Sequence, residues 1–95
     1  MIKININKDE ITIKGHSGYA EEGFDIVCAS VSSISITTVN ALLSIHEDCI
    51  EYEEKDGYLN IKIKKHNETI DKLIANMINL FSELEKDYKK YIEIR

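Results

Sequence analysis

Two stretches of the chain alternate isoleucine with polar residues, and each is interrupted by a polar turn. Residues 2–7 and 10–15 flank the first turn, and residues 49–55 and 58–64 flank Asp56-Gly57. An Asp-Gly pair between alternating segments is a strong hairpin signal, because the tight turn needs positive φ angles. The sequence therefore predicts two β-hairpins, each with an apolar face that another element must cover.

Two longer segments are candidates to cover the apolar faces of the hairpins. Between residues 69 and 91, apolar side chains recur at helical spacing and predict an amphipathic helix. Residues 25–46 show a similar spacing, although their many β-branched residues also suit a strand. Asp25 precedes this periodicity as a good N-cap and favours the helix. Ile92 and Ile94 allow a short final strand.

The resulting order is ββαββα, which predicts an α+β fold of two layers. We expect a mostly antiparallel sheet with both helices packed on it. The 95 residues contain no evident linker or repeat, so we expect one domain over residues 1–95.

Composition narrows the possible partners. The formal net charge of −5 argues against a protein that binds bare nucleic acid, because phosphate binding needs clustered Lys and Arg. We find no continuous apolar run close to the roughly 20 residues needed to span a bilayer, and no signal-peptide core. These features predict a cytoplasmic protein without membrane contact. Three scattered histidines and two cysteines without a CxxC motif predict neither a metal nor another cofactor.

The stretch GHSGYAEEGFDIVCAS, residues 15–30, departs from these regular patterns and contains three of the four glycines. It places His16 at the end of a predicted strand and Cys28 in the first turn of a predicted helix. A helix N-terminus stabilises a thiolate, and a neighbouring imidazole can take the thiol proton. Free N–H groups in that turn, including that of Cys28, would suit an oxyanion. The stretch thus contains a candidate nucleophile, base and oxyanion site.

From the pattern alone, the structural interpretation of these residues is the more common one. A cysteine among small apolar residues is usually a buried hydrophobe, and Cys49 on an alternating strand fits that description. His46 and His66, at a helix end and in a loop, are predicted to be solvated. Three glycines of the connection are predicted to make it compliant enough to admit a peptide: Gly15, Gly18 and Gly23.

The segment GHSGYAEEGFDIVCASVS resembles the signature of the ribosomal-processing cysteine protease family called Prp. In that family a Gly-His pair precedes a G-x-D-I-V-C-A segment. The resemblance extends over essentially the whole chain, but its specific part is residues 15–32. Ser17 stands where an alanine is common in the family, a change between small residues that we expect to matter little.

The resemblance implies a homodimeric bacterial endopeptidase with Cys28 as nucleophile and His16 as general base. It gives Asp25 and Ser32 supporting roles. Asp25 would either cap the helix or hold His16 in its protonated form, and Ser32 would either orient a group near the thiolate or pack. The implied substrate is the precursor of large-subunit ribosomal protein twenty-seven, from which a short N-terminal extension is removed.

Two other functions remain open at this stage. The chain could be a ribosome-assembly factor that binds the same ribosomal protein without cutting it. It could also be a redox sensor that uses an activated Cys28, although no resolving cysteine lies nearby in the sequence.

Overall fold

The computed structural model describes residues 1–21 and 25–95 and confirms the predicted order of elements. The first hairpin consists of β1 (Ile2–Ile6) and β2 (Glu10–Lys14). The second consists of β3 (Ile50–Lys55) and β4 (Tyr58–Ile63), joined at Asp56-Gly57. The helices are α1 (Ile26–Ile45) and α2 (Glu68–Asp87), and β5 (Ile92–Ile94) closes the chain.

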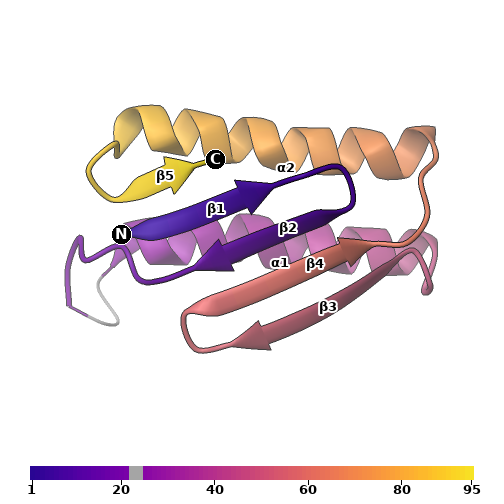
Figure 1. Cartoon of the computed structure of the whole chain (residues 1–95), viewed down its shortest axis with the longest axis horizontal. Helices are drawn as coiled ribbons and strands as arrows, with labels where there is room; N and C mark the ends of the chain where they lie inside the picture. Colours follow the sequence, from indigo (N-terminus) through magenta and orange to yellow (C-terminus); the bar gives the residue numbers. More distant parts are fainter. Residues whose placement is uncertain (22–24) are drawn as a thin grey trace.

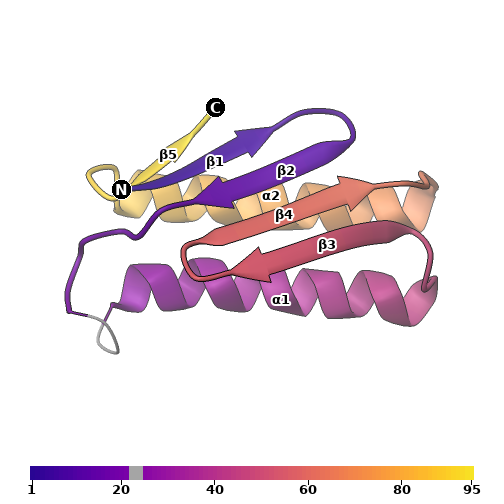
Figure 2. The ribbon, with the colours of Figure 1, turned by 60° about the horizontal axis from the view of Figure 1, so that its bottom comes forward.

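The five strands form one sheet in the order β3-β4-β2-β1-β5. All neighbouring pairs are antiparallel except β1 and β5, which run parallel. Both helices lie against the same face of this sheet, as the two views show (Figures 1 and 2). The predicted two-layer α+β fold is therefore correct.

The core lies between the sheet and the two helices. The alternating strand residues point into it, as the hairpin patterns require. From the sheet these are Ile2, Ile4, Ile11, Ile13, Leu59, Ile61 and Ile63, and from the helices Val27, Val31, Val39, Leu42, Ile70, Ile74, Met77 and Phe81. Cys49 is fully buried among them, which confirms its predicted structural role.

The segment with mixed signals, α1, is a helix because its polar side chains are satisfied within it. Asp25 caps its first turn, and three hydroxyls donate to carbonyls one turn earlier: those of Ser30, Ser35 and Thr38. The helix is also long and apolar enough to cross a membrane by length and composition alone. The search for a continuous apolar run did not detect this helix, because small polar residues interrupt its apolar runs without adding charge. Here its buried side packs against the sheet and α2.

The second helix ends earlier than the predicted limit near residue 91. It stops at Asp87, and Tyr88 leaves the helical conformation at φ −132° as the C-cap. The chain then turns, and β5 pairs with β1. The apolar periodicity continued through Tyr88 because this ring also packs, edge-on, against Tyr19 at a centroid distance of 5.6 Å.

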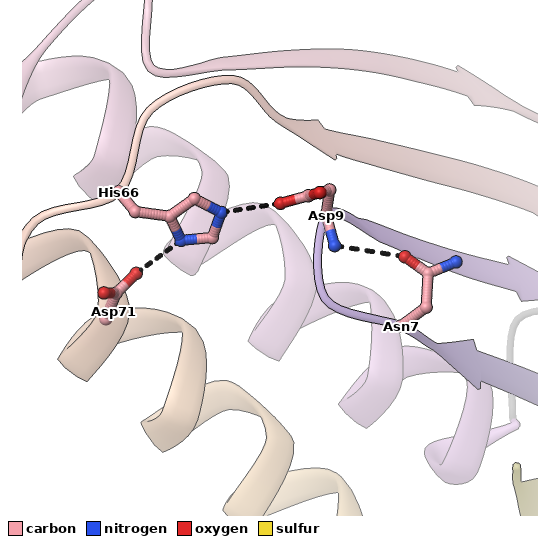
Figure 3. Close-up of polar contacts among 4 residues, drawn as sticks. All are labelled: Asn7, Asp9, His66 and Asp71. Carbon is pink, nitrogen blue, oxygen red and sulfur yellow. Dashed lines mark hydrogen bonds and ion pairs between the residues drawn. The ribbon is translucent and has the colours of Figure 1, made fainter.

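The two histidines predicted to be solvated also have polar partners. His46 is half-buried at the end of α1, and its ring accepts the Asp48 N–H at 3.2 Å. His66 is exposed but contacts Asp71 in the first turn of α2 and Asp9 in the β1–β2 turn, each at 2.8 Å (Figure 3). Hydrogen bonds to these two carboxylates, that of Asp71 foremost, raise the pKa of His66 above its ordinary value.

The contacts of His66 with Asp9 and Asp71 predict a pH-dependent contribution to the stability of the protein. The free energy gained by a raised pKa is fully present below the unfolded value, about 6.5 for histidine, and is lost as pH rises through the folded value. The melting temperature of the wild type should exceed that of His66→Gln by a few degrees at most near pH 5.5, because surface pairs contribute little. Thermal denaturation in a pH series should show this gap closing at alkaline pH. A gap that widens with pH would contradict the assignment.

Candidate active site

The end of β2, the start of α1 and the β3–β4 turn meet at one end of the molecule (Figures 1 and 2). The β1–β2 turn and its contact with His66 lie at the other end. A cleft of about 830 Å³ opens where these three segments meet. Its walls include the two residues predicted to be catalytic and both predicted supporting residues: His16, Cys28, Asp25 and Ser32.

Asp25 places Cys28 in the first turn of α1. Its Oδ1 accepts the backbone N–H groups of Val27 at 3.0 Å and Cys28 at 2.9 Å. The predicted cap is therefore correct. The predicted oxyanion site is not, because the Cys28 N–H and its neighbour are already bound to the carboxylate. The next N–H, that of Ala29, donates to the Asp25 carbonyl at 3.0 Å.

The second carboxylate oxygen of Asp25 faces Ser17 rather than His16. The Ser17 hydroxyl donates a short hydrogen bond to Asp25 Oδ2 and accepts the Tyr19 N–H at 3.1 Å. Partial burial raises the pKa of Asp25, but hydrogen bonds from this hydroxyl and from backbone N–H groups outweigh it and hold the pKa below its ordinary value. Asp25 is therefore ionised at neutral pH. Among the described residues, the Asp25 carboxylate accepts three hydrogen bonds, from the Val27 N–H, the Cys28 N–H and the Ser17 hydroxyl, and the His16 ring donates none of them.

Ser17 is a site residue that the sequence analysis underestimated. It is 3% exposed, and its backbone N–H donates to Cys28 Sγ at 3.2 Å. Tyr19, two residues further on, packs its ring against Tyr88 and Tyr91. These contacts hold the segment after His16 against α1 and the end of α2. A hydroxyl directly after the histidine was the only signal available in the sequence.

His16 lies against the β3–β4 turn. Its Nε2 is 3.8 Å from Asp56 Oδ2, and its side chain is 63% exposed. Gly57 makes room for the ring, since a Cβ there would lie 2.8 Å from His16 Nε2. The hydrogen bonds of the described residues include none between this ring and Cys28. The ring thus lies against the hairpin at the cleft, and most of the side chain is exposed.

The three glycines predicted to make the connection compliant differ in their surroundings. Gly15 has φ +97°, and a Cβ there would lie 2.5 Å from the Met1 carbonyl oxygen, so this glycine is required by close packing. Its N–H donates to the Gly57 carbonyl at 2.8 Å, which joins the end of β2 to the hairpin turn. Gly18 lines the cleft in open space, with φ +72°. Gly23 lies outside the described residues.

The remaining candidate residues differ in their exposure to the cleft. Ser32 is exposed on the cleft wall, one turn after Cys28, as its spacing predicted. Cys49 is fully buried, and its thiol donates to the Leu42 carbonyl at 3.4 Å. Burial raises the pKa of the Cys49 thiol, which argues against a role as resolving thiol. Within residues 1–21 and 25–95, no cluster of three His, Cys, Asp or Glu side chains is placed to hold a metal ion.

Comparison with known proteins identifies the family of the chain. Residues 1–93 match the family described as cysteine protease Prp. The chain belongs to this family. A ribosomal processing cysteine protease Prp from Mycoplasma genitalium is 36% identical over 75 residues, which cover 79% of this chain and 73% of that protein. Its counterpart from Staphylococcus aureus is 24% identical over 100 residues, which cover 98% and 94%.

Solved Prp structures share the fold. The crystal structure of the S. aureus Prp with a covalently linked product peptide matches with a TM-score of 0.87 at 23% identity, over 99% of this chain and 95% of that chain. The structure of the same protease with a substrate peptide gives a TM-score of 0.81 at 22% identity, over 99% and 95%. The family match therefore identifies a cysteine protease, and the structural match confirms its α+β architecture.

The contact between Gly57 and His16 predicts a specific effect on peptide cleavage by this Prp protein. In Gly57→Ala the new Cβ should displace the exposed His16 ring from the hairpin, because the ring moves more easily than the turn. A displacement of about 1 Å can lower a rate up to roughly 100-fold, so we expect kcat/KM to fall by about 10- to 100-fold. The left-handed φ of +66° should also cost about 1–2 kcal/mol of stability.

A second variant separates these two effects. Asparagine tolerates the left-handed conformation better than alanine but also carries a Cβ. Gly57→Asn should therefore recover much of the stability while its cleavage rate stays low. If Gly57→Asn cleaved as fast as the wild type, the hairpin would have no part in positioning His16. Steady-state cleavage assays and thermal denaturation measure the two properties independently.

Proposed function

We propose that this protein is a cytoplasmic endopeptidase that removes the N-terminal extension of large-subunit ribosomal protein twenty-seven, with Cys28 as nucleophile and His16 as general base. The observation that carries the proposal is that both side chains line one cleft at the start of α1, in a member of a cysteine protease family. The relatives' names add that they process ribosomal components.

In the first half of the reaction, the His16 imidazole takes the thiol proton of Cys28. The thiolate then attacks the carbonyl carbon of the scissile peptide bond and forms a tetrahedral intermediate. When this intermediate collapses, the C–N bond breaks and His16 returns the proton to the leaving amine. The exposed position of the His16 ring, in the cleft that Cys28 also lines, suits this step.

In the second half, His16 takes a proton from water as the water oxygen attacks the thioester carbonyl. Collapse of the second tetrahedral intermediate breaks the C–S bond and releases the new carboxyl terminus, and Cys28 recovers its proton. The chemistry consumes one water molecule for each peptide bond. Ser32, exposed one turn beyond Cys28, is positioned to contact the bound peptide rather than the core.

The charge of the cleft supports a basic substrate. Glu54 and Asp56 line its hairpin side, and Asp25 also lines it. Lys55 is the basic side chain among the described residues that line it. Ribosomal proteins are generally basic because they bind RNA, so an acidic cleft favours their approach.

Direct digestion of the precursor tests the proposal. The purified protein is incubated with the full-length ribosomal protein and, in parallel, with the same protein lacking the extension. Mass spectrometry should show one cut that releases the N-terminal extension from the first substrate and no cut in the second. Complex formation without cleavage would instead support the non-catalytic assembly factor. Cleavage elsewhere in the chain would reject this substrate assignment.

We also propose that the protein forms a homodimer, as the family resemblance implies, and that the outer side of α1 forms the contact. Ile26 and Ile45 are 50% and 48% exposed there, and Ala29 and Ser33 present small exposed side chains between them. Ser35 of the same helix is buried and lies on its packed side. Light scattering at micromolar concentration should give twice the chain mass of 10.9 kDa. A mass near that of one chain would reject the dimer.

A further inference from the structure

Ser17 connects the three parts of the cleft that must act together. It directly follows His16, its hydroxyl is bound to Asp25, and its N–H reaches Cys28 Sγ at 3.2 Å. The residue is 3% exposed, so these bonds are largely shielded from water. The same hydroxyl accepts the N–H of Tyr19, whose ring is packed at the end of α2. Ser17 therefore has a fixed orientation in a segment of otherwise exposed residues.

The position of Asp25 creates an electrostatic problem for a nucleophilic cysteine. Its carboxylate is bound to the Cys28 backbone at 2.9 Å, and a nearby anion opposes ionisation of a thiol. The first-turn N–H groups, which would favour the thiolate, are directed to the carboxylate and to the Asp25 carbonyl. Among the hydrogen bonds of the described residues, the donor that reaches the sulfur is the Ser17 N–H.

We propose that Ser17 is a positioning residue, whose hydroxyl binds Asp25 and thereby holds its own N–H as the donor that stabilises the Cys28 thiolate. The hydroxyl acts in two ways. Its hydrogen bond to Asp25 disperses part of the negative charge of the carboxylate. The same bond fixes the direction of the adjacent peptide group. Alanine at this position would leave the N–H in place but release the peptide group from Asp25. The inference rests on the proposed role of Cys28 as nucleophile.

Alkylation of Cys28 tests this without requiring a substrate. Iodoacetamide reacts with the thiolate, so the rate as a function of pH reports the ionisation of Cys28. Cys49 is buried and serves as the slow internal reference, with both sites followed by peptide mass spectrometry. In Ser17→Ala the midpoint of the Cys28 profile should rise by about one pH unit, with alkylation at pH 7 up to about tenfold slower. Ser30→Ala, which loses a hydroxyl bonded to the Ile26 carbonyl in the same helix turn, should keep the wild-type profile.

A second pair of variants guards against a folding defect. Ser17→Thr and Ser17→Val have the same shape and differ by the hydroxyl, so threonine should retain a lower midpoint than valine. Wild-type midpoints in Ser17→Ala and in Ser17→Val would overturn the proposal. If Ala and Val variants failed to fold while threonine folded, the hydroxyl would serve the fold alone, and the proposal would again be wrong. Cleavage of the ribosomal precursor is measured separately. If the midpoint shifts in Ser17→Ala but the wild-type protein does not cleave the precursor, the substrate assignment is wrong and the role of Ser17 stands. If the wild-type protein cleaves the precursor but the midpoint does not shift, the role of Ser17 is wrong.

Discussion

Cys28→Ala should abolish peptide cleavage while the protein remains folded. The substitution removes the sulfur that would form the thioester, and the cleft offers no replacement nucleophile at that position. The thiol is only partly buried, so its loss should change the free energy of unfolding by no more than about 1–2 kcal/mol. Digestion of the ribosomal precursor, followed by mass spectrometry, measures the activity. Chemical denaturation measures the stability.

Cys49→Ala is the matched control because it removes the other thiol of the chain. Cys49 is fully buried in the core, so this variant should lose more stability than Cys28→Ala, about 1–3 kcal/mol. Its cleavage rate per folded molecule should remain that of the wild type. Wild-type cleavage by Cys28→Ala would remove the nucleophile assignment, whatever the two stabilities are.

Features that depend on neighbouring residues could be predicted from the sequence. The Asp56-Gly57 turn defined the second hairpin to within a residue, and Asp25 located the start of α1 through the two N–H groups that it accepts. The sheet order and the parallel pairing of β1 with β5 could not be derived in this way, because they depend on contacts between opposite ends of the chain. The end of α2 was misplaced for the same reason, since Tyr88 packs against distant Tyr19.

The candidate site likewise has features that the sequence predicted and features that depend on the folded chain. The spacing of His16 and Cys28, together with the family resemblance, predicted two residues that line the same cleft. The close approach of Gly57 to His16 was not predictable, because it arises from the pairing of two hairpins. Ser17 was judged by its size, but its effect comes from the hydroxyl and from the direction of its N–H. Hydrogen-bond direction depends on the folded backbone and is not encoded in residue spacing.

His16→Ala should lower the rate of cleavage by about 100- to 10,000-fold, the usual contribution of general acid–base catalysis. The imidazole would be needed to remove the thiol proton, to protonate the leaving amine and then to take a proton from the attacking water. Stability should change little, because the ring is 63% exposed and its contact with Asp56 at 3.8 Å is a surface contact. Single-turnover cleavage of the precursor measures the loss in the chemical step directly.

Two further measurements distinguish the loss of a base from a general disturbance of the cleft. The vacated space beside Gly57 is open to solvent, so added imidazole should enter it and partly restore cleavage by His16→Ala. The same addition should not restore Cys28→Ala, in which the nucleophile is missing. His66→Gln removes a histidine at the opposite end of the sheet and should cleave at the wild-type rate. A loss below a few-fold in His16→Ala would instead make His16 a structural residue at the end of β2, and the base would have to be sought elsewhere in the cleft.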